Sequence, residues 1–349
     1  MLTFVAVIFV FSFVILIHEC GHFFMARKMG VRVERFCLGL GKVLWSVKKG
    51  DTEYAVALIP FGGYVKMAGE EAQDEKTGKP WEYYSKSPGR RFWILVSGAG
   101  MNYLFAFLVF CFIVPTPRIG MVLEDMPAYK AGVQTGDIIR SIDGVETNYW
   151  HDILDRISAN DKASPMRVEI ERDGKLLDVK ITPSFLESKD IFGRKSSQPK
   201  IGVGYYGDVV VMKAQPLRYL SLGIRQTMDN TLMTYKYIWL LITGKVAVRG
   251  SVTGPVGIAV IIGKAAHIGF AYLLYLIGHI NLALAIFNLL PFPVLDGGHV
   301  LFLGIEKLRK RPLSPKVQET MQYIAVSLLV AFFLFVSYND IVMWFMPGQ

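Results

Sequence analysis

Four apolar runs in this 349-residue sequence set the kind of structure that it can form. They cover residues 2–25, 92–114, 271–290 and 320–346. A helix needs about 20 apolar residues to cross the hydrocarbon core of a bilayer, and each run reaches that length. Because lipid offers no partners for backbone polar groups, such runs form helices. The sequence therefore predicts an α-helical membrane protein with four transmembrane helices.

The rest of the chain is too polar to lie in lipid. Hydrophobic residues make up 52% of the sequence, but 19% of it is charged, which predicts a water-soluble part beside the spans. The net charge of +9 does not indicate a nucleic-acid partner, because much of the excess lies in short segments beside the apolar runs. Membrane lipid is the expected partner. The three scattered cysteines imply no disulfide framework.

The positive charges also predict the orientation of the spans. Residues 27–91 contain 13 Lys and Arg against 8 Asp and Glu, and residues 304–316 contain five Lys and Arg against one Glu. Segments rich in Lys and Arg remain in the cytoplasm. The N-terminus, the region between the second and third spans and the C-terminus then lie outside. The first run lacks a basic start and a small-residue cleavage site, so we expect it to be retained.

The first apolar run contains His18, Glu19 and His22 in its C-terminal part. Residues four apart share one face of a helix, so both imidazoles can reach one metal ion. The glutamate between them is then placed to take a proton from water. An ionisable group at the membrane centre costs about 2.5–3.5 kcal/mol on insertion scales, which favours a functional role. The alternative is a soluble core helix with a solvated polar patch.

A catalytic zinc ion needs three protein ligands and an open position. The third ligand is expected in residues 288–299, which follow the third apolar run. Pro291 and Pro293 end that helix, so Asp296 follows on irregular backbone close to the membrane. A metal ion would offset the cost of placing its carboxylate there. His299 is a competing ligand.

Residues 217–266 contain two short apolar stretches interrupted by several charged residues. We expect an amphipathic segment on the outer leaflet rather than a fifth span. A fifth span would also move residues 288–299 to the opposite side of the bilayer from His18. A metal site that needs both segments would then be impossible.

Residues 118–204 have balanced charges and short alternating apolar stretches. A helix is expected over 149–158, and strands over 167–172 and 177–182. The pattern PAYKAGVQTGDII followed by SIDG resembles a PDZ domain, which binds a peptide end or extended strand between a strand and a helix. By this resemblance, the carboxylate-binding loop and the adjoining strand are formed by Ile119, Gly120, Met121 and Val122.

Taken together, HExxH in the first span, the inserted PDZ-like segment and NxxPxPxLDGG after the third span resemble the site-2 protease family. These are intramembrane zinc metalloproteases, and the bacterial RseP and RasP type with a single PDZ domain is the most similar. The resemblance covers nearly the whole chain. It implies one Zn²⁺ per chain, bound by His18, His22 and Asp296, with Glu19 as general base. It also implies that Asn288 holds the substrate or stabilises the oxyanion. The alternative is that Asn288 caps the broken helix.

The same resemblance implies a domain organisation. Residues 1–114 and 270–349 are the two halves of a protease core, around the PDZ domain at 118–204 and the interfacial segment at 217–266. A membrane-associated β-structure is expected over 39–67, and an unwound substrate would contact Gly62, Gly63 and Tyr64 there. An ordinary cytoplasmic hairpin is the alternative for this segment. The small residues at 97–102 are expected to allow close helix packing, and no catalytic role is assigned to them.

The implied substrates are single-span membrane proteins, such as anti-sigma factors, or leftover signal peptides. The implied location is the bacterial inner membrane, with the PDZ domain outside and the active site near the cytoplasmic side. His18 lies about 24 Å along the first span at 1.5 Å per residue, which agrees with that depth. The PDZ domain would bind a peptide C-terminus or act as a steric filter.

Two other functions fit parts of the sequence. A non-catalytic membrane scaffold would use the PDZ domain alone, but a structural metal site has no need of Glu19. A zinc transporter would need polar positions through several spans, and the second and fourth runs have almost none.

Overall fold

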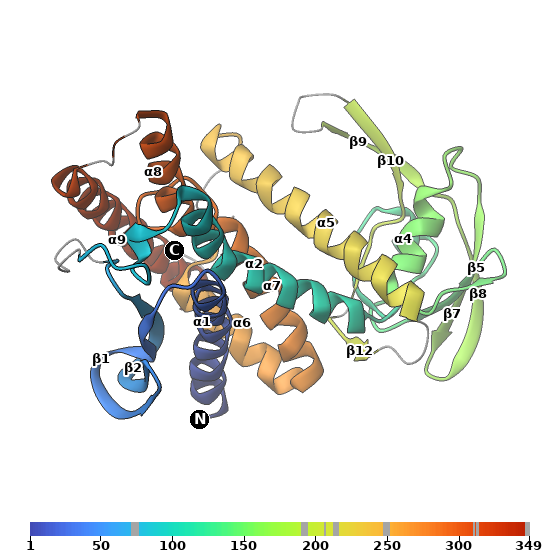
Figure 1. Cartoon of the computed structure of the whole chain (residues 1–349). Helices are drawn as coiled ribbons and strands as arrows, with labels where there is room; N and C mark the ends of the chain where they lie inside the picture. The colour runs from blue at the N-terminus through green and yellow to red at the C-terminus, as the bar shows by residue number, and fades with distance from the viewer. Residues whose placement is uncertain are drawn as a thin grey trace.

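The computed structural model describes residues 1–70, 77–189, 195–205, 207–211, 216–246, 252–309, 311 and 314–345. A bundle of helices forms one part of the molecule, and a β-rich domain inserted between α2 and α5 lies to one side of it (Figure 1). Four helices in the described residues are long and apolar enough to cross a membrane. They are α1 (Leu2–Lys28), α2 (Pro88–Phe112), α7 (Phe270–Asn288) and, over Lys316–Val342, α9 (Pro315–Phe345). These helices coincide with the four apolar runs of the sequence.

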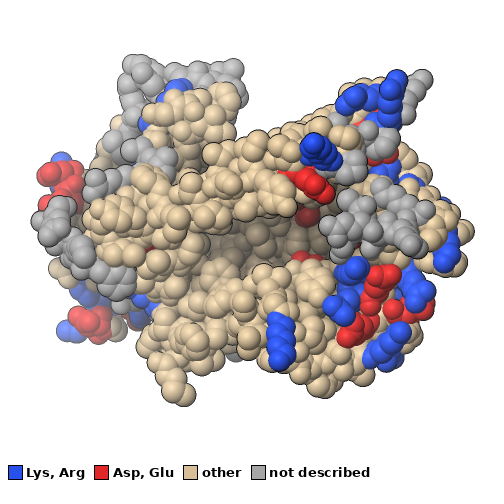
Figure 2. Space-filling view, turned by 90° about the vertical axis from the view of Figure 1, so that its left-hand side faces the viewer, with Lys and Arg blue, Asp and Glu red and all other residues tan. Residues whose placement is uncertain are grey.

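The surface of the helical part is consistent with a membrane environment. One face of the molecule carries a broad band that is largely free of Lys, Arg, Asp and Glu, and charged side chains gather toward its two ends (Figure 2). Many large apolar side chains of α9 are exposed, including Leu334, which is 68% exposed. An apolar surface of this extent is favourable in lipid and unfavourable in water.

Helix α2 lies at the centre of the bundle and packs against α1, α5 and α7. Its contact with α1 is close because glycines face each other: a Cβ on Gly21 would lie 2.2 Å from the carbonyl oxygen of Ser97. The small residues at 97–102 therefore allow the close helix packing predicted for them.

Strands β1 (Val33–Lys49) and β2 (Thr52–Met67) form a curled two-stranded sheet after α1. It begins six residues before the predicted β-structure at 39–67. The first half of β1 lies between two segments of β2, since Leu38 pairs with Val56 and also with Gly63. Leu44 and Trp45 are exposed. Such a surface is typical of a segment in contact with lipid. A short 3₁₀ helix, η1 (Tyr83–Ser85), precedes α2.

The inserted domain has its own buried core, which includes Ile119, Ile139, Ile153 and Ile170. Its main sheet has the order β6-β5-β7-β8, and two further pairs are β4 with β11 and β9 with β10. In chain order its elements are β4 (Ile119–Val122), α3 (Pro127–Lys130), β5 (Ile138–Ile142), β6 (Val145–Glu146), α4 (Trp150–Ser158), β7 (Met166–Arg172), β8 (Lys175–Ile181), β9 (Ser184–Lys189), β10 (Lys195–Lys200) and β11 (Val203–Tyr205). Strands β3 (Ile113–Pro115) and β12 (Val209–Val211) pair where the chain enters and leaves the domain.

The loop and adjoining strand predicted at Ile119, Gly120, Met121 and Val122 are borne out in part, because the strand is present as β4 but the loop is not formed by these residues. Ile119, Gly120, Met121 and Val122 all lie in β4, so none of them forms a loop. The amide of Ile119 donates to the carbonyl of Asp137, and its own carbonyl accepts from Gly136. These backbone bonds extend the strand through the position where a loop was expected.

The prediction of one interfacial amphipathic segment over residues 217–266 is wrong in part. The structure has two helices, α5 (Pro216–Ile242) and α6 (Pro255–Ile268), and both pack against the apolar helices. Ile262 of α6 is fully buried in the cluster that α1 and α7 form. Both arginines of α5 pair with α4 of the inserted domain, Arg218 with Asp152 at 2.7 Å and Arg225 with Asp155 at 2.5 Å. The uncharged Gln226 and Thr227 are buried, and Gln226 donates a hydrogen bond to the hydroxyl of Tyr275 on α7.

Candidate active site

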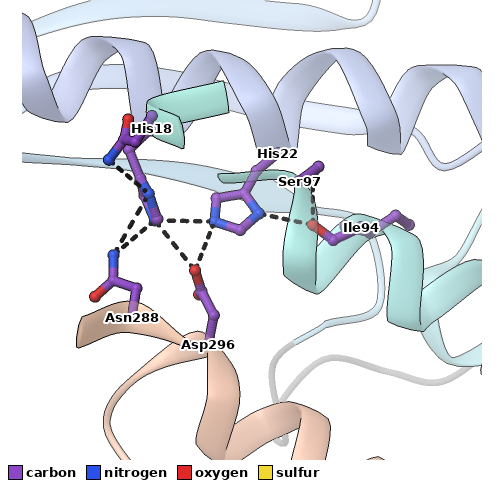
Figure 3. Close-up of polar contacts among 7 residues, drawn as sticks. His18, His22, Ile94, Ser97, Asn288 and Asp296 are labelled. Atoms are coloured by element: carbon purple, nitrogen blue, oxygen red, sulfur yellow. Dashed lines mark hydrogen bonds and ion pairs between the residues drawn. The ribbon is translucent and has the colours of Figure 1, made fainter. Parts of the chain in front are cut away.

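Three possible metal ligands from distant parts of the sequence meet inside the helical bundle. His18 and His22 project from α1, and Asp296 projects from the first turn of α8 (Asp296–Arg309) (Figure 3). The two Nε2 atoms are 3.2 Å apart, and Asp296 Oδ2 lies 3.3 Å from that of His18 and 3.5 Å from that of His22. In the described part of the chain, these residues are the one group of three His, Cys, Asp or Glu side chains placed to hold a metal ion.

The chain after α7 folds tightly to bring Asp296 to this point. Helix α7 ends at Asn288, as the following prolines predict. Asp296 is the first residue of helix α8, so the prediction that it lies on irregular backbone is wrong. A Cβ on Gly297 would lie 2.3 Å from the carbonyl oxygen of Leu290, and one on Gly298 would lie 2.1 Å from that of Phe292. The two glycines after the aspartate are therefore required for this turn.

The geometry fits a zinc ion. A tetrahedral zinc site with bonds of about 2.0–2.2 Å places its ligand atoms about 3.3–3.6 Å apart, close to the spacing of the three atoms here. Asp296 Oδ2 is buried, and among the described residues it has no hydrogen-bond partner, so it is available to bind a metal ion. Space beside the ligands is kept by Gly98 of α2, because a Cβ there would lie 2.3 Å from His22 Nε2 and 2.8 Å from His18 Nε2.

The imidazole of His22 is oriented by α2. Its Nδ1 lies 2.9 Å from the carbonyl oxygen of Ile94, which also accepts a hydrogen bond of 2.7 Å from the hydroxyl of Ser97 (Figure 3). Donation from Nδ1 leaves the lone pair of Nε2 directed at the ligand cluster. A backbone acceptor on the far ring nitrogen is a common support for metal-binding histidines.

Glu19 lies between the histidines and the hairpin. The backbone of Val65 in β2 hydrogen-bonds its carboxylate, and His18, His22 and Asp296 are close enough to interact with its charge. A Cβ on Gly63 would lie 3.2 Å from Glu19 Cγ, so the β2 backbone approaches the side chain closely. The glutamate is thus held beside the ligand cluster by an extended strand.

The structure brings some of the other predicted site residues to this centre and leaves others apart. The Asn288 amide nitrogen lies 3.4 Å from both ring nitrogens of His18. Gly63 is next to Glu19, but Gly62 packs on Leu40, and the hydroxyl of Tyr64 accepts a hydrogen bond from Arg35. His299 lies on α8 with its ring against Phe302 and is outside the ligand group.

Two features of the site were missed from the sequence. Asn102 of α2 is fully buried, with its amide nitrogen 3.4 Å from His18 Nδ1. Arg91 of α2 binds both carboxylate oxygens of Glu306, at 2.6 and 3.1 Å, and so ties α2 to the helix that begins with Asp296. The signal for both was a polar side chain at the edge of or within an apolar run, where such groups are costly unless partnered.

Comparison with known proteins places this arrangement in a family. The profile of peptidase family M50 matches residues 6–332, which includes the two histidines, Glu19 and Asp296. The chain belongs to peptidase family M50. Its membership, together with the names of its relatives, makes it a zinc metalloprotease, and its several apolar helices make it a multi-pass membrane protein.

The relatives of this M50 protease match it along nearly its whole length. Zinc metalloprotease RasP of Oceanobacillus iheyensis is 26% identical over 98% of this chain and 99% of its own length. Regulator of sigma-E protease RseP of Salmonella typhimurium is 29% identical over 96% and 97%. Cj1068 of Campylobacter jejuni, which carries the name of a zinc metalloprotease, is 32% identical over 97% and 93%.

A PDZ domain of the SdrC-like protein from Listeria monocytogenes is similar to part of the chain. It is 21% identical, with a TM-score of 0.22, and the match covers 26% of this chain and 87% of that one.

Proposed function

We propose that this M50 protease hydrolyses peptide bonds within single transmembrane segments, using one zinc ion per chain. The observation that carries the proposal is the meeting of His18, His22 and Asp296 beside Glu19, on a helix that is apolar enough to cross a membrane. The names of two relatives, zinc metalloprotease RasP and regulator of sigma-E protease RseP, support the same chemistry. A structural metal site would need no glutamate at this position.

The depth of the site supports cleavage inside the bilayer. His18 is the seventeenth residue of α1, about 24 Å from its start at 1.5 Å per residue, and the hydrocarbon core is about 30 Å thick. With the positively charged segments after α1 and α8 in the cytoplasm, the scissile bond falls in the cytoplasmic third of the membrane. The N-terminus, the inserted domain and the C-terminus are then outside, and we place the protein in the bacterial inner membrane.

The residues of the site have separate roles in the reaction. A zinc ion bound by His18, His22 and Asp296 would supply Lewis-acid polarisation of the substrate carbonyl and of water. Glu19 takes a proton from the attacking water and delivers it to the leaving amine nitrogen. Its carboxylate is oriented for this by the backbone of Val65. The Asn288 amide, which lies beside His18, donates a hydrogen bond to the developing oxyanion.

The hairpin provides a means of presenting the substrate. The backbone N–H and C=O groups of a transmembrane helix are hydrogen-bonded within the helix, so the helix must unwind before a peptide bond can be cut. The β2 backbone around Gly63 lies against Glu19, and an unwound segment would pair with the extended chain at Gly62, Gly63 and Tyr64. The hydrogen bonds lost on unwinding are then replaced beside the catalytic base.

The substrates that fit this site are single-span membrane proteins and remnant signal peptides. The name of the Salmonella relative, a regulator of sigma-E protease, favours an anti-sigma-type regulator among them. The inserted domain at 119–205 would act as a PDZ domain on the outer side. There it either binds a peptide C-terminus near Ile119, Gly120, Met121 and Val122 or excludes substrates with large outer domains.

Zinc content and cleavage by the Glu19→Gln variant test this function together. We expect one zinc per chain in both wild type and variant, measured by elemental analysis of purified protein. A single-span model substrate should be cut by wild type alone. Appreciable cleavage by Glu19→Gln would remove Glu19 as the base, and folded wild-type protein without zinc would overturn the metal site.

A further inference from the structure

The two histidines of the site differ in how their far ring nitrogens are supported. Both present Nε2 to the ligand cluster, so in a zinc-bound state Nδ1 carries the proton and needs an acceptor. For His22 the acceptor is the carbonyl oxygen of Ile94 at 2.9 Å. For His18 the polar atoms near Nδ1 are the amide groups of Asn102 and Asn288, each at 3.4 Å.

Geometry separates the two asparagines. The Asn288 amide is equally distant, at 3.4 Å, from Nδ1 and Nε2 of His18, so it cannot lie along the N–H direction of Nδ1. The Asn102 amide contacts Nδ1 alone. Asn102 therefore lies on the side of the ring that faces away from the metal ligands.

Asn102 also has an unused acceptor in a place where one is costly. The residue is 0% exposed on α2, a helix apolar enough to cross a membrane, and its Oδ1 has no hydrogen-bond partner in the described part of the chain. In the orientation of the structure the Asn102 amide nitrogen lies 3.4 Å from His18 Nδ1, so with zinc on Nε2 a donor would face the Nδ1–H donor. A half-turn of the planar amide about its Cβ–Cγ bond exchanges Nδ2 and Oδ1 and places the acceptor against that hydrogen.

We propose that Asn102 accepts the Nδ1–H of His18 through Oδ1 and is the positioning residue for this zinc ligand. The bond holds the imidazole in the tautomer whose Nε2 lone pair faces the metal, as Ile94 does for His22. The inference rests on the proposed zinc site and adds a residue to it. Loss of such a support typically lowers metal affinity by about 10- to 100-fold.

The test compares zinc dissociation constants of full-length protein in detergent, measured by competition with a chelating fluorophore. Asn102→Leu keeps the approximate size of the side chain but removes the acceptor, and Asn102→Asp keeps an acceptor. The matched control is Asn281→Leu, because Asn281 is also 0% exposed in an apolar helix but donates to the Ile277 carbonyl instead. The visible spectrum of the cobalt-substituted proteins reports whether the ligand geometry is kept.

We expect Asn102→Leu to bind zinc about 10- to 100-fold more weakly, with an altered cobalt spectrum. Asn102→Asp and Asn281→Leu should stay within about threefold of wild type. Wild-type affinity in Asn102→Leu would overturn the proposal, as would equal losses in Asn102→Leu and Asn102→Asp, which would indicate a packing role. Absence of zinc from the wild type would instead contradict the proposed function.

A measurement on wild type keeps the proposal testable if Asn102→Leu does not fold. In zinc-loaded protein with ¹⁵N-labelled histidine, the Nδ1 of His18 should carry a hydrogen that exchanges slowly with solvent. An Nδ1 hydrogen that exchanges as fast as that of a histidine without an acceptor, or a His18 ring without a hydrogen on Nδ1, would overturn the proposal.

Discussion

Replacing Gly98 by alanine tests whether the space beside the histidines is the metal site. The added Cβ would lie 2.3 Å from His22 Nε2, 2.7 Å from His18 Cε1 and 2.8 Å from His18 Nε2, whereas ordinary contacts are 3.4–4 Å. The His22 ring would have to move by about 1 Å to restore normal contact, and its hydrogen bond to Ile94 limits that movement. The substitution therefore acts directly on the two ligand nitrogens.

The magnitude follows from the cost of overpacking. One extra carbon in a well-packed site costs about 1–3 kcal/mol, and 1.4 kcal/mol corresponds to a factor of ten. We expect the zinc dissociation constant of Gly98→Ala to rise by about 5- to 150-fold. The clash involves side-chain atoms that can rotate, so the fold should persist, as judged by circular dichroism and gel filtration.

Two glycines on the same helix pair serve as comparisons. Gly100→Ala changes the same helix two residues later, where a Cβ meets no described atom within 4 Å, so its zinc affinity should equal that of wild type. Gly21→Ala clashes with backbone atoms of Ser97 and should lower both zinc affinity and stability. If Gly98→Ala and Gly100→Ala bind zinc equally well in a chelator competition assay, the assignment of this space to the metal is wrong.

Three further predictions concern the ligands and the contacts that support them. Asp296→Asn should lower zinc occupancy well below one per chain by elemental analysis, and full occupancy would remove Asp296 as a ligand. Arg91→Met and Glu306→Met should each lower the free energy of unfolding of the detergent-solubilised chain by about 1–3 kcal/mol. Each substitution removes both hydrogen bonds of the pair and leaves the other charged side chain without its partner. The double variant should lose less than the sum, and strict additivity would show that the pair is not coupled. Asp137→Asn removes a buried carboxylate that Arg172 binds at 2.8 Å through two nitrogen atoms, and should cost about 2 kcal/mol at pH 7. Although burial raises the pKa of Asp137, hydrogen bonds from Arg172 and from the amide of Gln134 lower it more strongly, so its folded pKa lies below the ordinary value. The stability that it adds is therefore present above about pH 3.9 and is lost as the pH falls through the folded pKa. Unfolding curves of wild type and Asp137→Asn should converge at low pH, and a constant difference would contradict this.

Features that depend on local sequence were predictable. The apolar runs have the length of a bilayer, and the spacing of His18 and His22 places them on one helical face whatever surrounds them. The prolines after Asn288 end α7 because they lack an amide donor, and the structure ends the helix at that residue.

Features that depend on which helices become neighbours were not predictable from one sequence. Asn102 and Arg91 show only as polar residues in or beside an apolar run, and their partners lie 84 and 215 residues away in the chain. The packing of α5 was missed because its charged residues suggested a surface helix. The structure pairs Arg218 with the inserted domain, and this leaves Gln226 free to bond Tyr275 of α7.

Mapping the cleavage site in a single-span substrate by mass spectrometry shows directly whether the protein cuts within the membrane. The purified wild-type protein would be reconstituted with the substrate in vesicles, with Glu19→Gln as the control for contaminating proteases. We expect a cut inside the transmembrane segment, in the third nearest the cytoplasmic side, made by wild type alone. A cut only in the water-exposed flanks, or the same cut with Glu19→Gln, would contradict an intramembrane metalloprotease built on this site.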